Sequence, residues 1–231
     1  MRLAIMQPYI FPYIGYYQLA GAVDKFVFLD DVNYINKGWI NRNNILINGQ
    51  ANLFTIPLKD ASQNKLINEV EVSEGKWSEK LLRTIEMAYK KAPCFSDAFP
   101  VINEVLSSEE RLIGNLAKKS VQSVSDYLQL PTTYVNSAGE YSNKELKGQS
   151  RIIDIVEKEN GSDYINPIGG TDLYEKKTFQ EKNIRLHFLQ TKKIVYPQSK
   201  NEFVPFLSII DVLMFNKKMD IKNYLNEFEL I

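Results

Sequence analysis

The sequence predicts an α/β fold, a Rossmann-like, mostly parallel sheet core with a helical insertion and a helical C-terminus. Two short apolar runs, residues 3–6 and 26–29, have the continuous pattern of strands that are covered on both faces. A helix-compatible segment, residues 14–23, lies between them, so the three form a β-α-β unit with parallel strands and a right-handed crossover. A second alternation of helix and strand over residues 151–189 extends the same kind of sheet.

An antiparallel piece follows the first β-α-β unit. Segments 45–47 and 53–58 flank Asn48-Gly49, a residue pair that favours the type I′ turn of a tight hairpin. A strand-like run at 70–72 is expected to extend this antiparallel piece.

The middle of the chain is predicted to be helical. Apolar residues recur at helical spacing over 77–91 and 107–128, and Pro93 and Pro131 close these two helices. They define a helical subregion within residues 76–130.

The remaining segments continue the alternation, apart from a polar stretch at 137–148 whose composition suits a mobile loop over a site. Strands are expected at 132–136, 164–165 and 184–189, and helices at 151–159, 172–182, 208–215 and 221–228. We expect the whole chain, residues 1–231, to form one α/β domain.

Composition narrows the class of protein. With 231 residues, 44% hydrophobic and 24% charged, the chain can bury a real core, and equal numbers of basic and acidic residues, 28 each, give no field that favours nucleic acid. The single cysteine, Cys94, excludes an internal disulfide framework and fits a reducing cytosol. No apolar stretch is long enough for a signal peptide or a membrane span, so a cytoplasmic protein is expected. The oligomeric state is left open, a homodimer included.

Several kinds of site are excluded. His187 is the only histidine and lies in a strand-like run, which argues against a histidine-rich metal site and against a Ser-His-Asp triad. No P-loop motif occurs, and Gly169-Gly170 is too short for a dinucleotide fingerprint. We predict no metal site from clustered ligands.

Two carboxylates, Asp30 and Asp31, directly follow the second apolar run. They are predicted to be catalytic, one as a base and the other as an orienting group, and they could also hold Mg²⁺. The alternative is a turn in which an aspartate caps the following backbone.

A polar segment then brings charge and a flat ring together. Lys37 and Arg42 bracket Trp39 and Asn41, so a loop that binds an anion and a base or sugar is expected. Lys37 and Arg42 are predicted to bind phosphate or stabilise an oxyanion, and Trp39 and Asn41 to contact substrate. The alternative is an ordinary solvated loop.

The loop after the first strand is rigid and aromatic. Two prolines fix its backbone, and Gly15 permits close approach of a ligand or of a neighbouring element. We expect Gln7, Tyr13, Tyr16 and Trp39 to form the wall of a substrate crevice, and Gly15 to contact the substrate. A proline-stiffened connection packed against the core is the alternative.

These motifs resemble the WbqC-like family, whose opening reads Gln-Pro-x-x-Phe-Pro-x-x-Gly, then Leu-Asp-Asp-Val, then Trp-x-Asn-Arg. The matching residues are Gln7, Pro8, Phe11, Pro12, Gly15, Leu29, Asp30, Asp31, Val32, Trp39, Asn41 and Arg42. The resemblance continues through residues 164–174, with Gly169 and Gly170, and through Tyr196, Gln198, Phe203, Pro205 and the segment 208–213. Where many members have a histidine after Trp77, this chain has Lys80-Leu81-Leu82.

The resemblance implies a role in clusters that make O-antigen lipopolysaccharide and related surface polysaccharides. It implies a transferase that forms an amide on a nucleotide-linked amino sugar, with a small acyl or aminoacyl donor as its second substrate. Tyr196 and Gln198 lie in an irregular, proline-containing stretch and are expected to contact substrate, as are Gly169 and Gly170 in a tight loop.

Two other hypotheses about the function stay open. Residues 12–16 are similar in layout to the His-x-Gly-His region of nucleotidylyl transferases, with Tyr13 and Tyr16 where the histidines would be. An ATP-dependent ligase that activates a small acid would follow from that layout, with ATP or Mg²⁺ as cofactors. The other hypothesis is a non-enzymatic protein that binds a nucleotide sugar or acts as a scaffold.

Overall fold

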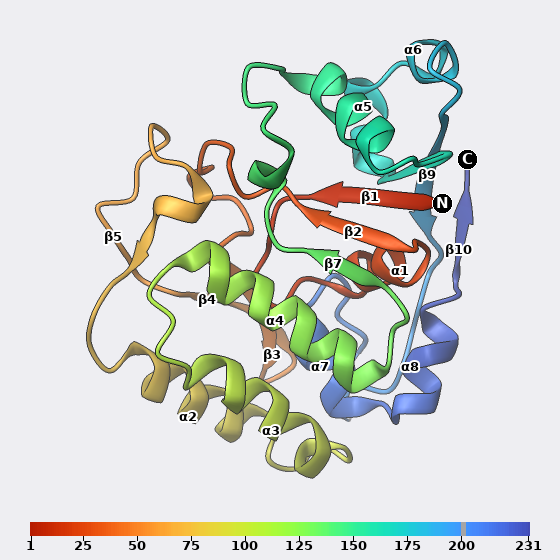
Figure 1. Cartoon of the computed structure of the whole chain (residues 1–231). Coiled ribbons are helices and arrows are strands. Elements are labelled where there is room, and N and C mark those ends of the chain that lie inside the picture. The colour runs from red at the N-terminus through yellow and green to blue at the C-terminus, as the bar shows by residue number, and fades with distance from the viewer. Residues whose placement is uncertain (200–201) are drawn as a thin grey trace.

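The structure is a computed structural model that describes residues 1–199 and 202–231. Its centre is a six-stranded sheet in the order β10-β9-β8-β1-β2-β7 (Figure 1). Five neighbouring strands are parallel and β10 is antiparallel to β9, which confirms the Rossmann-like, mostly parallel sheet. The strands are β1 Arg2–Met6, β2 Lys25–Phe28, β7 Thr133–Val135, β8 Asp163–Pro167, β9 Arg185–Thr191 and β10 Phe228–Leu230.

The first β-α-β unit forms as predicted. Helix α1 (Ile14–Gly21) connects β1 to β2, which pair in parallel from Leu3 beside Lys25 to Met6 beside Phe28. Because strand side chains alternate between faces, Ala4 joins the core cluster that includes α1, while Leu3 and Ile5 join the cluster on the other face. Continuous apolar runs therefore mark strands buried on both faces.

The predicted hairpin is also present. Strands β3 (Arg42–Ile47) and β4 (Gln50–Thr55) pair in antiparallel fashion, and Asn48 and Gly49 between them have positive φ angles of 51° and 76°.

The expected extension of this hairpin at 70–72 is wrong. Strand β6 (Glu71–Val72) pairs instead with β5 (Leu58–Lys59) in a separate two-stranded ladder. Pro57, which has no N–H to continue a ladder, stands between β4 and β5.

The helical middle contains three helices where two were predicted. Helix α2 (Trp77–Tyr89) matches its prediction, α3 (Phe95–Leu106) was missed, and α4 (Ile113–Leu128) begins later than expected. Pro100 lies inside α3, and a proline there is a breaker by local rules. Tertiary packing overrides this, because Ala98, Ile102 and other residues of α3 are buried in the core.

Helices cover both faces of the sheet. Helices α5 (Gly148–Lys158) and α6 (Lys176–Gln180) share one core cluster, whereas α1, α4, α7 (Ile209–Phe215) and α8 (Lys218–Tyr224) share the other. Short 3₁₀ turns are η1 Ile67–Glu69, η2 Ala138–Tyr141 and η3 Ile168–Leu173. The helix expected at 172–182 is present as the shorter α6. No helix in the described part of the chain is long and apolar enough to cross a membrane.

The chain ends in a strand, which corrects the helix expected up to residue 228. Helix α8 stops at Tyr224, and β10 then pairs with the free edge of β9, with Phe228 opposite Thr191. Local periodicity cannot anticipate this pairing, since the partner strand is about 40 residues away in the sequence.

The topology also fixes where a ligand is expected. Strand order runs from β1 to β2 and β7 in one direction and from β1 to β8 and β9 in the other. In open α/β sheets, ligands bind beyond the carboxyl ends of the strands at such a reversal. A ligand is therefore expected at the loops after β1, β2, β8 and β9.

Candidate active site

The loop after β1 is held rigidly by three other segments. Phe11 has a positive φ of 41°, a conformation that costs free energy for a bulky side chain. Its N–H donates to Ser120 Oγ (2.9 Å), and its carbonyl accepts from Ser208 Oγ (2.7 Å) and Asn43 Nδ2 (2.8 Å). The strained turn is thus stabilised by α4, β3 and the start of α7, and it delivers Tyr13 to the start of α1.

The two tyrosines of this loop have different surroundings. Tyr16 is buried against Phe26, its hydroxyl donates to the Gln7 carbonyl (2.9 Å), and burial raises its pKa well above the usual value. Tyr13 is 39% exposed. The structure therefore does not bring the two tyrosines together in one crevice wall. Tyr13 faces solvent and Tyr16 lies in the core.

Gly15 makes room for the Tyr13 ring. A Cβ built on Gly15 would lie only 2.3 Å from Tyr13 Oη. The close approach expected at this glycine thus involves a neighbouring side chain, and it keeps the phenol over the first turn of α1.

Asp30 is buried in an ion pair. Lys118 Nζ of α4 lies 2.9 Å from Asp30 Oδ2 and also donates to the Asn136 carbonyl (3.0 Å), while Ser137 Oγ donates to Asp30 Oδ1 (2.6 Å). The carboxylate connects the end of β2 to α4 and to the loop after β7.

Asp31 is equally enclosed. An Arg151 NH₂ group donates to both of its oxygens (2.8 and 2.6 Å), and Arg151 Nε donates to Asn143 Oδ1 (3.0 Å). We call Asp30, Asp31, Lys118 and Arg151 the carboxylate cluster. Paired and buried in this way, the two aspartates position helices; the catalytic role expected for them stays a prediction.

The loop at 37–42 exposes a ring and a cation. Arg42 Nε donates to the Gly38 carbonyl (2.9 Å), a second Arg42 nitrogen donates to the Lys37 carbonyl, and the guanidinium lies 5.8 Å from the ring centre of Trp39. Trp39 is 47% exposed and Lys37 is exposed with a φ of 61°. The loop borders the first one, because Ile10 N donates to the Ile40 carbonyl (3.2 Å).

Asn41 belongs to the core of that loop. It is buried, accepts from the Tyr34 hydroxyl (2.9 Å) and donates to the Ile56 carbonyl (2.8 Å). Both ends of its amide are satisfied within the protein, so the substrate contact expected for it stays a prediction.

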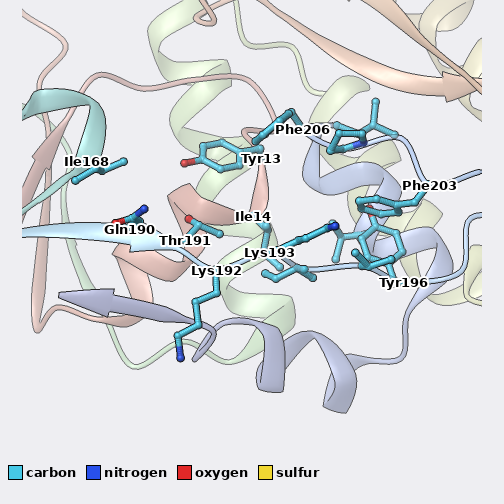
Figure 2. Close-up of a pocket in the computed structure, with 15 residues that line it drawn as sticks. Tyr13, Ile14, Ile168, Gln190, Thr191, Lys192, Lys193, Tyr196, Phe203 and Phe206 are labelled. Carbon is cyan, nitrogen blue, oxygen red and sulfur yellow. The ribbon is translucent and has the colours of Figure 1, made fainter. Parts of the chain in front are cut away.

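A cavity of about 810 Å³ lies at the carboxyl edge, on the β8 and β9 side (Figure 2). Tyr13 lines it from the loop after β1, Ile14 from the start of α1, Ile168 from the loop after β8, and Thr191 from the end of β9. The remaining lining residues come from segments 190–196 and 203–207 and from α7. The volume lies within the range of about 300–1,000 Å³ that is typical of small-molecule sites.

The rim of this cavity exposes apolar side chains. Phe206 is 82% exposed and Val195 54%, and both line the cavity with the half-exposed Tyr13 and Ile168. Phe206 also has a positive φ of 58°. A bulky residue that is both solvent-exposed and strained points to a functional constraint rather than to packing.

The cavity wall is anchored by a buried carboxylate, Asp211 of α7. Tyr196 Oη (2.8 Å) and Gln198 Nε2 (2.7 Å) donate to Asp211 Oδ2, and Tyr89 Oη (2.9 Å) donates to Oδ1. Burial raises the pKa of Asp211, and these three hydrogen bonds offset that effect only in part. Gln198 also forms two hydrogen bonds with the backbone of Val204, which fixes the start of segment 203–207.

Tyr196 and Gln198 therefore have a structural role, since both donate hydrogen bonds to Asp211, and the substrate contact expected for them stays a prediction. Tyr196 lines the cavity, but its hydroxyl is engaged by Asp211, and Gln198 is buried behind the wall. Gly169 is exposed with open space around it, whereas Gly170 is buried where a Cβ would lie 1.8 Å from Asn166 Nδ2. A ligand can thus approach the backbone of Gly169.

Sequence reasoning missed several residues of this edge. Lys118 and Arg151 lie 88 and 120 positions from their aspartates, and no local signal pairs them. The cavity residues Lys193 and Phe206 follow no motif, although an exposed Pro-Phe pair within an irregular stretch is a weak sign of a binding loop.

These features define an open α/β protein with a cavity at the carboxyl edge, beside the reversal of strand order. The chain belongs to the WbqC-like protein family, whose sequence model matches residues 7–223. It is 24% identical over 227 residues, 97% of each chain, to the uncharacterized protein Rv1507c of Mycobacterium tuberculosis. No solved structure matches the chain.

Proposed function

We propose that this protein is a transferase of O-antigen or related surface-polysaccharide biosynthesis that forms an amide on a nucleotide-linked amino sugar. The observation that carries the proposal is the cavity at the carboxyl edge, which is lined in part by the loop after β1. A second loop, hydrogen-bonded to that one through Ile10 and Ile40, exposes a ring and a cation. Membership of the WbqC-like family supports the pathway.

The two substrates are assigned to two neighbouring places. The nucleotide part stacks on Trp39, and Arg42, with Lys37 beside it, neutralises phosphate. An activated acyl or aminoacyl donor occupies the cavity. The sugar amine attacks its acyl carbon, the bond from that carbon to the leaving group breaks, and the departing group takes up the amine proton. The Tyr13 hydroxyl is available to donate to the acyl oxygen as charge develops on it. In this assignment Asp30 and Asp31 hold the edge in shape through their ion pairs.

Product analysis tests the reaction. Purified protein is incubated with nucleotide-linked amino sugars and candidate donors, with and without ATP, and the sugars are followed by mass spectrometry. A mass gain equal to the acyl or aminoacyl group is expected without ATP. Release of AMP and pyrophosphate with the gain would instead indicate a ligase, and no gain with saturable sugar binding would indicate a binding protein.

Calorimetry tests the assignment of the nucleotide part. Trp39→Ala and Arg42→Ala are each expected to weaken nucleotide-sugar binding by about 1–3 kcal/mol, as for loss of a stacking partner or a charged hydrogen bond. Arg83→Ala removes an exposed arginine of α2 and is the matched control. Equal affinity in all three variants would remove the proposed nucleotide site.

A further inference from the structure

The residues that line the cavity are mostly apolar. Its described lining residues include aliphatic side chains, among them Ile14, Ile194, Leu207 and Val212, and four aromatic ones, but no aspartate or glutamate. Such walls offer few partners for the hydrogen-bonding edge of a base or for sugar hydroxyls. They suit an apolar chain, which gains free energy in proportion to the area it buries.

Two lysines at the end of β9 give the cavity a charge. Lys192 and Lys193 both line it, but Figure 2 shows the Lys193 side chain directed toward Phe203 and Tyr196 and that of Lys192 directed away. Lys192 lies 3.9 Å from Glu227, whereas no ion pair of Lys193 is found among the described residues. The ammonium group of Lys193 is thus a cation beside an apolar cavity.

The exposed rim indicates that a ligand covers the mouth of the cavity as well as its interior. Phe206, Val195 and Ile168 present apolar surface at the mouth, and the strained backbone at Phe206 holds its ring there. In the free protein this surface is in water, which is unfavourable unless a ligand covers it.

We propose that the cavity binds a linear apolar acyl chain with an anionic end, the chain lying between the aromatic and aliphatic walls and the anionic end beside Lys193. That a thioester of such a chain is the donor of the amide-forming reaction, with the thiol as the leaving group, rests on the proposed function, whereas the binding itself does not. The chemistry is shared by a free fatty acid and by an acyl group carried on a phosphate-bearing thiol.

Calorimetry with hexanoate, octanoate and decanoate tests the apolar chain. Each added methylene is expected to tighten binding roughly three- to fourfold, the effect of burying one more CH₂. Affinity that does not change with chain length would overturn the proposal. Octanoyl thioesters with and without a phosphate-bearing carrier, titrated in the same way, distinguish the two sources of the acyl chain.

A matched lysine pair tests the anionic end. Lys193→Gln is expected to weaken decanoate binding about two- to fivefold, the effect of losing one exposed ion pair, and to leave binding of 1-decanol unchanged. Lys192→Gln should bind both ligands as the wild type does. Equal losses in the two variants would overturn the role of Lys193.

The rim is tested by Phe206→Asn. Asparagine accepts the positive φ better than phenylalanine, so the variant should fold at least as stably while losing about tenfold or more in decanoate affinity. Unchanged affinity would contradict coverage of the rim. Displacement of decanoate by UDP, sensitive to Lys193→Gln, would identify a nucleotide site instead and overturn the proposal, while leaving amide formation to the separate product assay.

Discussion

The carboxylate cluster beyond β2 and the cavity beyond β9 lie at the same edge of one sheet, yet they use it in opposite ways. In the cluster, Asp30 and Asp31 are buried, and each is paired with a cation from a distant helix. In the cavity the walls are apolar, and Lys193 faces an open volume. A position at a strand end therefore makes a ligand site only where open space remains and the nearby groups are not already paired within the protein.

Burial and pairing explain the difference. A buried charge is costly unless it is paired and hydrogen-bonded, so the cluster must satisfy its own groups and becomes rigid. The cavity can leave groups unsatisfied because its rim is in water. Variants that alter one region and spare the other are the sharpest tests of this contrast.

The largest effect is expected from Arg151→Met, which leaves the Asp31 carboxylate buried without its partner. Loss of one member of a buried ion pair costs about 3–5 kcal/mol of unfolding free energy. Urea denaturation measures it, with Lys59→Met as control, because the Lys59–Glu71 pair is exposed and should cost about 1 kcal/mol or less. A loss in Arg151→Met as small as that in Lys59→Met would show that the carboxylate cluster does not stabilise the fold.

Asp211→Asn should have the next largest effect. The two carboxylate oxygens together accept hydrogen bonds from three donors, and in asparagine one of these oxygens is replaced by an NH₂ group, which cannot accept. We expect a loss of about 1–3 kcal/mol. The pKa of Asp211 is raised in the fold from its usual 3.8, so its contribution to stability is fully present below that value and is lost as pH rises through the folded pKa.

Unfolding free energies of the two proteins between about pH 3.5 and pH 7 check this sign. The advantage of the wild type over Asp211→Asn should be greater at the acidic end. A greater advantage at neutral pH would mean that the carboxylate is stabilised, not penalised, by its surroundings.

Gly15→Ala should affect the cavity more than stability. The new Cβ would displace the Tyr13 ring, a partly exposed side chain that can move, so the loss should stay below about 1 kcal/mol. Binding in the cavity should weaken. Gly21→Ala in the same helix meets only Leu130 Cδ2 at 3.8 Å and should be neutral or stabilising by up to about 1 kcal/mol, with binding intact.

Tyr13→Phe should be the mildest change in stability, within about 0.5 kcal/mol, because it removes one hydroxyl at the surface. If that hydroxyl donates to the acyl oxygen during transfer, kcat should fall while decanoate affinity stays unchanged. Thermal unfolding, turnover and calorimetry on one preparation separate these outcomes. An unchanged kcat would remove Tyr13 from the chemistry and leave it as a cavity wall.

The first β-α-β unit and the hairpin were predictable because their signals are local. Continuous apolar runs mark β1 and β2, and Asn48-Gly49 supplies the two positive φ angles of its turn. Helix α3 and strand β10 were missed for the opposite reason. Pro100 contradicts α3 locally, and β10 exists because β9 offers a free edge.

The candidate site divides in the same way. The sequence indicated the loops after β1 and β2 and the stretch around Tyr196, and these segments do lie at the carboxyl edge. It could not separate Tyr13 from Tyr16, since one faces solvent and the other packs on Phe26. Spacing along a chain does not say which of two nearby rings is buried.

By itself, then, the sequence determined the fold class, the hairpin and the resemblance to the WbqC-like family, because periodicity, turn residues and motifs are properties of neighbouring residues. The tertiary structure alone decided that Arg151 pairs with Asp31 across 120 positions and that Asp211 anchors the cavity wall. Those contacts depend on which side chains packing brings together, and burial then fixes whether a polar group is consumed within the protein or left free for a ligand.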